Sequence, residues 1–329
     1  MSDTLALMHS FVGPPSPESL RRVSGFDRAQ LGDALSELAV DPDARRELEA
    51  HWDETRESTR WAPLLAALSD YVRRERASVD APIPIWDDLD DLGTEGRLLY
   101  YYLFALELET LKAHYDLVGV PPDVRRATLA ALASHGKTHL LKHASAGVDA
   151  GWWMLLILRG VLIQVESLKF HALHLGVGVL SPQPWLAQDE AARRGEGFRV
   201  GDAHLGVHIP ARADLSDEAL DRTFARAREV VAQVWPVPTR RIATCQSWMM
   251  DDRLVQALGE ESRIVRFQRR FELLEPYADD VENVLYFVFG VRDVDPAQLQ
   301  PRSRLQRFIK EVLVAGGAWH SRIGWLDMS

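Results

Sequence analysis

The sequence of 329 residues contains a single cysteine, Cys245. An internal disulfide is therefore impossible, and the cysteine content does not indicate an oxidising compartment. No run of lysine and arginine is longer than a pair, and the formal net charge is −10. Because nucleic-acid binding draws on clustered cations, we expect no nucleic-acid partner.

Long apolar runs are also missing. The most apolar windows, residues 98–108 and 152–165, are interrupted by Glu or Arg and are too short to cross a bilayer. The first residues lack the basic n-region of a signal peptide. We therefore expect a cytoplasmic protein with no membrane partner. The sequence does not indicate an oligomeric state.

Several functional motifs are absent. No G-x-G-x-x-G follows a strand, and there is neither a Walker motif nor a G-x-S-x-G elbow. The carboxylates of residues 86–91 lack the alternating ligand spacing and the turn glycine of an EF-hand. His135, His139 and His143 share one helical face, but no carboxylate stands at a matching position. We expect no metal cofactor.

The first 146 residues show helical periodicity and no convincing strand. Asp27 can cap a helix that carries Leu31 and Leu35, and Asp41 precedes a proline in the first turn of the next helix. Apolar residues of 61–72 recur at helical spacing, and further helices are expected over 95–117 and 123–133. Residues 1–146 are therefore predicted to form an all-helical N-terminal domain.

From residue 147 onward the pattern changes to strands mixed with helices. Residues 162–175 alternate at nearly period two, with a bulge expected at Ser167-Leu168. We expect helices at 149–161, 216–235, 251–258, 262–271 and 305–314, strands at 162–175, 199–210 and 241–249, and a hairpin of 271–275 with 283–289. The predicted class is α/β (α+β), with a mixed sheet flanked by helices over residues 147–329.

The centre of this second domain is the stretch 203–251, which is predicted to be strand, helix and strand. A helix that crosses between parallel strands brings the ends of those strands close together. We therefore expect His208, at the end of the first strand, to lie near the segment 245–248 of the second.

Four segments carry a resemblance to a known family: 207–210, 245–250, 262–271, and the Gly316-Gly317 turn together with Gly324-Trp325. In these segments the chain resembles a two-domain bacterial acyltransferase family with a helical N-terminal domain and a GNAT-like C-terminal domain. The resemblance implies transfer of an acyl group from a thioester donor, acyl-CoA or another carrier, to an amine of a small-molecule substrate.

The chain departs from the typical GNAT pattern at one turn. That superfamily holds the CoA pyrophosphate on a glycine-rich turn at a helix N-terminus. The corresponding turn here, 211–218, has no glycine and carries Asp214, Asp217 and Glu218, while Ser216 is placed to cap the helix. Arg212 is its only cation. CoA therefore binds differently, or another carrier is the donor, or CoA binding has been lost.

Two residues are candidates for the general base that amide formation needs. Imidazole titrates near neutral pH, so His208 is either that base or a structural histidine. Glu166 is a second candidate, although a solvent-facing strand position explains it more simply.

The cysteine segment offers further candidates. Cys245 is either a nucleophile that forms an acyl-enzyme or a small core residue. Ser247 is placed to protonate the leaving group or to donate a hydrogen bond to the acyl oxygen. Trp248 is a candidate wall of the acyl pocket or a core residue. Strand alternation puts Cys245 and Ser247 on one face and Gln246 and Trp248 on the other. The rival hypothesis is a non-catalytic binding protein that keeps the fold without a working CoA site.

Overall fold

The computed structural model of the protein describes residues 3–83, 86, 89–175, 188–195, 197–235, 242–274, 278–292 and 294–328. The chain forms two compact units, Met1–Ile163 and Gln164–Ser329. The first is helical and the second contains the sheet, so the predicted fold class is confirmed. No described helix combines the length and the apolar character that crossing a membrane requires.

The N-terminal unit is built around one long helix, α6, whose side chains are buried on nearly every side from Leu98 to Leu108. A helix that is apolar all round belongs in a core. The helices of this unit are α1 (Asp3–Val12), α2 (Pro17–Gly25), α3 (Arg28–Glu37), α4 (Pro42–Glu57), α5 (Trp61–Arg74), η1 (Leu89–Leu92), α6 (Thr94–Val118), α7 (Pro122–Leu129), α8 (Ala131–His143) and α9 (Trp153–Leu158).

The helix starts in this unit follow the capping rules. Asp27 accepts a hydrogen bond from the backbone N–H of Gln30, and the Gln30 side chain accepts one from the backbone N–H of Asp27, which completes a capping box before α3. The Asp41 side chain caps α4 by accepting hydrogen bonds from the backbone N–H groups of Asp43 and Ala44, with Pro42 at the first helical position. These predictions from the sequence are confirmed.

The C-terminal unit is a mixed sheet in the order β1-β2-β3-β4-β7-β5, with β6 also pairing with β7. Its elements are β1 (Leu162–Val165), β2 (Leu168–His174), α10 (Gln188–Arg194), β3 (Ala203–His208), α11 (Asp217–Val234), β4 (Ile242–Ser247), η2 (Trp248–Met250), α12 (Leu254–Leu258), α13 (Arg263–Gln268), β5 (Glu272–Leu273), β6 (Ala278–Asp279), α14 (Val281–Val284), η3 (Leu285–Phe289), η4 (Pro296–Gln298), α15 (Arg304–Val314) and β7 (His320–Asp327).

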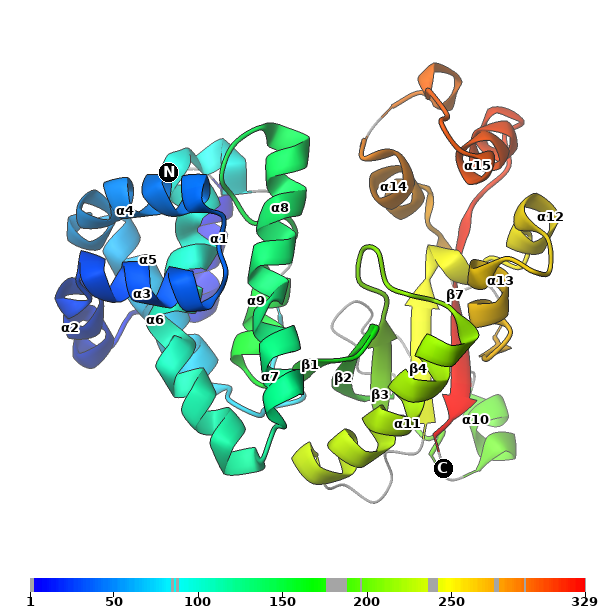
Figure 1. Ribbon diagram of the computed structural model, residues 1–329, viewed down its shortest axis with the longest axis horizontal. Coiled ribbons are helices and arrows are strands. Elements are labelled where there is room, and N and C mark those ends of the chain that lie inside the picture. The colour runs from blue at the N-terminus through cyan, green and yellow to red at the C-terminus, as the bar shows by residue number, and fades with distance from the viewer. Residues whose placement is uncertain are drawn as a thin grey trace. The chain divides into compact units, whose positions relative to one another are not determined.

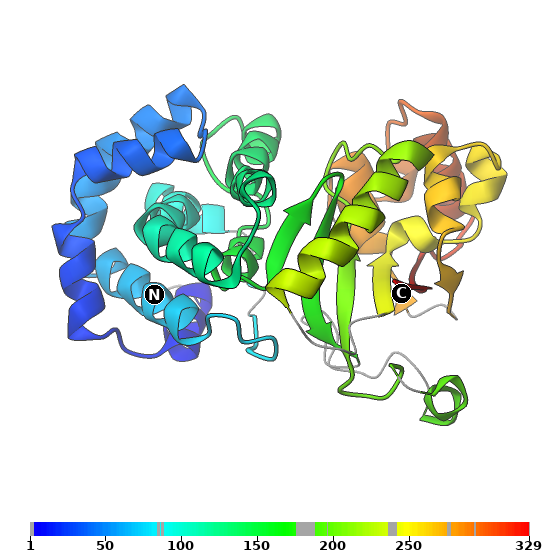
Figure 2. The ribbon, with the colours of Figure 1, turned by 60° about the horizontal axis from the view of Figure 1, so that its bottom comes forward.

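The strand–helix–strand unit predicted for 203–251 is present. β3 and β4 are parallel neighbours, and α11 crosses one face of the sheet between them (Figure 1 and Figure 2). Phe224 of α11 packs edge-on against Phe170 of β2, with ring centroids 6.2 Å apart. This contact identifies the sheet face that α11 covers.

One predicted strand is in fact a hairpin. Residues 162–175 form β1 and β2, which are joined by a turn at Glu166 and Ser167 and are neighbours in the sheet. Glu166 has a φ of 49°, in the left-handed region that a tight turn between antiparallel strands needs. The break in alternation read as a bulge is this turn.

Two predictions near the C-terminus were wrong. The segment 283–289 is helical (α14 and η3), so it forms no hairpin with 271–275, because a short apolar run fits a buried helix as well as a strand. The strand β7 was not predicted at all. It pairs along the full length of β4, from Ile242 opposite Asp327 to Ser247 opposite Arg322.

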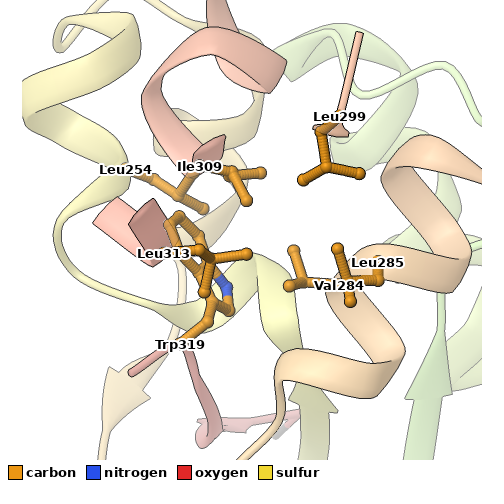
Figure 3. Packing of buried hydrophobic residues seen from close by; sticks show 7 residues of the cluster. All are labelled: Leu254, Val284, Leu285, Leu299, Ile309, Leu313 and Trp319. Atoms are coloured by element: carbon orange, nitrogen blue, oxygen red, sulfur yellow. The ribbon is translucent and has the colours of Figure 1, made fainter. Parts of the chain in front are cut away.

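The helices after β4 make a small apolar core of their own. Figure 3 shows Trp319 beside Leu313, with Val284 and Leu285 approaching from the opposite side. Trp319 is fully buried, and its indole N–H donates to the carbonyl of Trp248 at 3.1 Å. This bond connects the small apolar core to η2, which directly follows β4.

Candidate functional site

The predicted site residues gather mainly at one edge of the sheet. β3 ends at His208 and β4 at Ser247, and these parallel strands end on the same side. Lys169 pairs with His208, so the turn with Glu166, just before β2, lies at this edge too. Arg212 follows β3 by four residues and has a φ of 65°. Ligands of open α/β sheets bind outside the carboxyl ends of the strands.

The described ladder between β3 and β4 is short. It joins Leu205 with Ala243 and Gly206 with Thr244, whereas β3 continues to His208 and β4 to Ser247. The side chains of His208 and Ser247 are only partly buried. Alternation along β4 puts Ser247 on the face opposite His208, and His208 Nε2 is buried, so the two side chains share this end of the sheet but not one face.

His208 lies on the sheet face opposite α11. Cross-strand partners point to the same face of a sheet. Lys169 is the partner of His208, and His171 is the partner of Gly206, so both side chains lie on the same face as His208. The rings of His171 and His208 are 5.6 Å apart. A Cβ at Gly206 would lie 2.7 Å from Leu173 Cδ1 and would displace that side chain, whereas its distances of 3.4 Å to His208 Nε2 and 3.5 Å to His171 Cβ are ordinary contacts.

Two basic groups on this face have lowered pKa values. Burial, together with the charge of Lys169, lowers the pKa of His208 to about 3. Burial lowers the pKa of Lys169, which is 8% exposed, to about 8. At neutral pH the imidazole is uncharged and the lysine is still mostly protonated. His208 can therefore take part in hydrogen bonds but binds a proton weakly.

Cys245 does not meet His208. Alternation along β4 puts Cys245 on the face that α11 covers, opposite the face of His208. The thiol is 1% exposed, and burial raises its pKa to about 12. A nucleophilic cysteine needs a depressed pKa, so the surroundings of Cys245 are those of a core residue.

Ser247 and Trp248 lie where β4 becomes the short helix η2. The hydroxyl oxygen of Ser247 accepts a hydrogen bond from the backbone N–H of Met249 at 3.1 Å, which caps η2. Trp248 packs against the apolar core that surrounds Trp319. Both side chains are half-buried at the sheet edge, and neither contact involves His208.

The acidic turn before α11 is paired with arginines. Arg263 Nη1 lies 3.5 Å from Asp214 Oδ1, and Arg266 Nε lies 3.4 Å from Asp217 Oδ2. Arg270 contacts Asp217 at 3.3 Å and Asp221 at 2.6 Å. The sequence of this turn suggests an unbalanced negative charge, but arginines balance that charge in the structure.

Ser216 does not cap α11 with its side chain, contrary to the sequence-based expectation. Asp214 Oδ1 accepts a hydrogen bond from the backbone N–H of Ser216 at 3.0 Å, which closes the turn before α11 without capping the helix. Backbone and side-chain hydrogen bonds with Ser216 and the charge of Arg263 hold the pKa of Asp214 below its usual value.

Sequence reasoning missed Lys169 and the arginines of α13. Lys169 was read as the solvent side of an alternating strand, but both faces of β2 are buried. The arginines at 263, 266 and 270 recur at helical spacing, which was the available signal. Their partners, however, stand about fifty residues earlier in the chain.

The histidine row of α8 makes local contacts. His135 Nδ1 bonds the carbonyl of Asp149 at 2.7 Å, and His139 Nδ1 bonds that of Ser145 at 3.0 Å. Among the described residues no group of three or more His, Cys, Asp or Glu is placed to hold a metal. The acidic segment 86–91 lies largely outside those residues.

The sequence matches two protein families in succession. Residues 162–326 match the family described as "GNAT-like C-terminal domain", and residues 29–160 match that described as "N-acyltransferase N-terminal domain". A comparison with curated proteins gave no match.

Solved structures with the same fold span nearly the whole chain. An acyltransferase in complex with decanoyl-CoA has a TM-score of 0.76 at 22% identity, over 100% of this chain and 97% of that one. An acyltransferase mutant in complex with octanoyl-CoA reaches 0.78 at 24% identity, over 98% and 94% of the two chains. A third, in complex with decanoyl-CoA and teicoplanin, reaches 0.76 at 24% identity over the same shares.

Proposed function

The chain belongs to the family of GNAT-like acyltransferases that carry an N-acyltransferase N-terminal domain, and we propose that it transfers an acyl group from acyl-CoA to an amine of a small molecule. The observation that carries this proposal is the match of both halves, in the same order, along residues 29–160 and 162–326.

The donor and acceptor classes come from the structural relatives. Those proteins hold octanoyl-CoA or decanoyl-CoA, and one of them also holds teicoplanin. We extend to this chain the use of a medium-chain acyl-CoA. For the acceptor we extend only the general class, a small molecule with a reactive amine.

The surroundings of the candidate residues favour direct transfer. A buried, protonated Cys245 is poorly suited to an acyl-enzyme, so the amine attacks the thioester carbon itself. The C–N bond forms as the C–S bond breaks, and the proton that the amine loses passes through solvent to the departing CoA thiolate. Neutral His208, at the sheet edge, accepts a hydrogen bond from the attacking amine. Lys169, across from it, supplies positive charge near the developing oxyanion.

The acidic turn at 214–218 favours a second candidate function, a binding protein that has lost CoA chemistry. Its carboxylates stand where the superfamily holds pyrophosphate. Arginines pair with these carboxylates and balance the local charge, so the acidic turn is weaker evidence against CoA binding than its sequence alone suggests.

A transfer assay separates the two functions. The protein is incubated with acetyl-, octanoyl- or decanoyl-CoA and a panel of amines, and mass spectrometry follows the acylated product while a thiol reagent follows released CoA. We expect amine-dependent release, and we expect His208→Ala to lower kcat/KM about tenfold, the size of one lost hydrogen bond, with His51→Ala as the histidine control. No product with any donor, together with no rise in melting temperature when CoA is added, would favour the binding protein instead.

A further inference from the structure

Two parallel helices in the C-terminal unit form a ladder of opposite charges. Asp214 and Asp217 at the start of α11 face Arg263 and Arg266 of α13, and Asp221 faces Arg270 one turn further along. Figure 1 shows α13 beside the end of α11 that follows β3. The ladder thus begins where the β3–α11 turn meets the carboxyl ends of the parallel strands.

The ion pairs of this ladder differ in distance and in hydrogen bonding. Arg270 donates a 2.6 Å hydrogen bond to Asp221, so its guanidinium is committed. Arg263 and Arg266 approach their carboxylates only to 3.5 Å and 3.4 Å, and Arg266 also lies 3.7 Å from Glu261. In the described part of the chain neither guanidinium group donates a hydrogen bond, although the backbone N–H of Arg266 donates to the carbonyl of Ser262. The Nε of Arg266 is buried without a hydrogen-bond partner.

The Arg266 side chain is 39% exposed, and its Nε lies 3.4 Å from Asp217 Oδ2, so the ion pair holds the group without a hydrogen bond. The Nε–H can therefore donate to a better acceptor at a low cost. The neighbouring end of α11 is similar, since Ser216 provides no side-chain cap for this eighteen-residue helix. Two arginines and a helix N-terminus therefore converge with donors to spare.

Phosphate is the chemical group that fits these donors best. A phosphate accepts several N–H bonds at once and binds the planar guanidinium bidentately, more strongly than a long contact to an exposed carboxylate. Exposed ion pairs contribute little to stability, so exchanging a carboxylate for a phosphate has a low cost. Acyl-CoA carries a pyrophosphate and a 3′-phosphate.

The hollow nearby is a weaker candidate. It has a volume of about 390 Å³ and is lined by Asp221, Phe224, Arg228, Arg270 and Leu326. Its two arginines are already hydrogen-bonded, Arg228 to the carbonyl of Met328 and Arg270 to Asp221. Arg263 and Arg266 are therefore the better candidates for binding phosphate.

We propose that Arg263 and Arg266 of α13 bind phosphate groups of the acyl-CoA donor, in place of the glycine-rich turn that this chain lacks. Asp214 and Asp217 hold the two guanidinium groups in position until the ligand arrives. The inference rests on the proposed use of acyl-CoA, and it assigns the phosphate-binding role to α13 rather than to the turn before α11.

Calorimetric titration with free CoA tests the arginines without requiring turnover. Arg263→Gln and Arg266→Gln should each weaken CoA binding about tenfold, and the double variant more. Arg269→Gln is the matched control, because Arg269 lies beside the same helix but pairs with Glu260 at 2.8 Å, away from α11. Circular dichroism checks that all variants fold. Equal affinity of wild type and the double variant would overturn the inference.

Removing a competing carboxylate gives the opposite expectation. Asp214→Asn keeps the oxygen that accepts the Ser216 N–H but removes the charge beside Arg263, so CoA should bind about threefold more tightly. A purely structural ladder predicts no gain. Unchanged or weaker binding would count against a role for Asp214 as a placeholder for phosphate.

A phosphate-free donor separates this inference from the proposed function. The thioester of decanoate with N-acetylcysteamine lacks every phosphate of CoA. If the arginines bind phosphate, Arg266→Gln lowers kcat/KM with decanoyl-CoA but not with this thioester. An equal loss with both donors would assign the arginine a structural role and leave acyl transfer standing, whereas absence of transfer from either donor by the wild type would refute the proposed function.

Discussion

His208 is the residue whose chemistry depends most on its neighbours. Its imidazole shares a buried sheet face with Lys169 and His171, so a proton on the ring costs both desolvation and repulsion. The sequence indicated a base that titrates near neutrality. The fold instead keeps the ring neutral over the whole physiological range.

This depressed pKa should make stability depend on pH. In the unfolded chain His208 binds a proton below about pH 6.5, whereas in the folded protein it does so only near pH 3. The unfolded state therefore binds more protons in this window, and the free energy of unfolding falls as pH decreases from 6.5 toward 3, by at most about 1.4 kcal/mol per pH unit from this group. Urea titrations between pH 6.5 and about pH 4.5 should show a shallower fall for His208→Gln. Parallel slopes for the two proteins would contradict the expected desolvation of His208.

Cys245 offers a second test at the scale of one residue. Because the thiol is buried in the α11-facing core, Cys245→Ala should cost about 1 kcal/mol of stability and leave kcat within about threefold of wild type, as direct transfer requires. Denaturant titration and the transfer assay measure the two effects. A well-folded variant without activity would instead favour an acyl-enzyme.

Among the elements of the N-terminal unit, α6 carries an ion cluster in its otherwise apolar surface. The Glu107 carboxylate, with 0% exposure, contacts Arg22 at 2.8 Å and Arg73 at 3.1 Å and accepts hydrogen bonds from Ser69 and Thr110. Burial raises its pKa, but these hydrogen bonds and the charge of Arg22 outweigh that effect and hold the pKa below its usual value. The cluster joins α2, α5 and α6.

Replacing Glu107 should therefore destabilise the unit strongly. Glu107→Gln leaves the arginines facing a neutral amide, and we expect a loss of about 3 kcal/mol, discounted for their partial exposure. Chemical denaturation measures it. Glu18→Gln is the matched control, since Glu18 is 73% exposed and lies 3.8 Å from Arg73, and it should leave stability nearly unchanged. Similar midpoints for both variants would mean that the cluster contributes little.

Elements with strong local signals were predictable from the sequence. The apolar stripe of α11 predicts that helix. The capping residues Asp27 and Asp41 predict the starts of α3 and α4. β7 was not predicted because its stability comes mainly from pairing with β4 and from the apolar core around Trp319, just before the strand. Neither kind of contact produces a recognisable pattern in the local sequence. The site followed the same rule: the shared edge of His208 and Ser247 came from strand order, while Lys169 and Arg266 depended on three-dimensional neighbours.

For the whole molecule, the division between the units lies at a strand. The units divide after Ile163, yet β1 runs from Leu162 to Val165 and pairs within the sheet. A fragment of residues 161–329 should therefore be more soluble than one of residues 168–329, whose β2 loses its neighbour and becomes an open edge. Size-exclusion chromatography and far-ultraviolet circular dichroism compare them. Equal monomer yields would show that β1 is dispensable.

The place of β7 in the sheet has a consequence for synthesis. Residues 320–327 fill the position between β4 and β5, so a nascent chain that has emerged only to Trp319 holds β4 with an unpaired edge. The helical N-terminal unit, rich in local contacts, can fold early on the ribosome, whereas the sheet must wait for its last strand. During that interval an exposed strand edge is a target for chaperones and for misassembly between nascent chains. Translation rate late in the message should therefore affect the yield of active protein more than translation rate early in it.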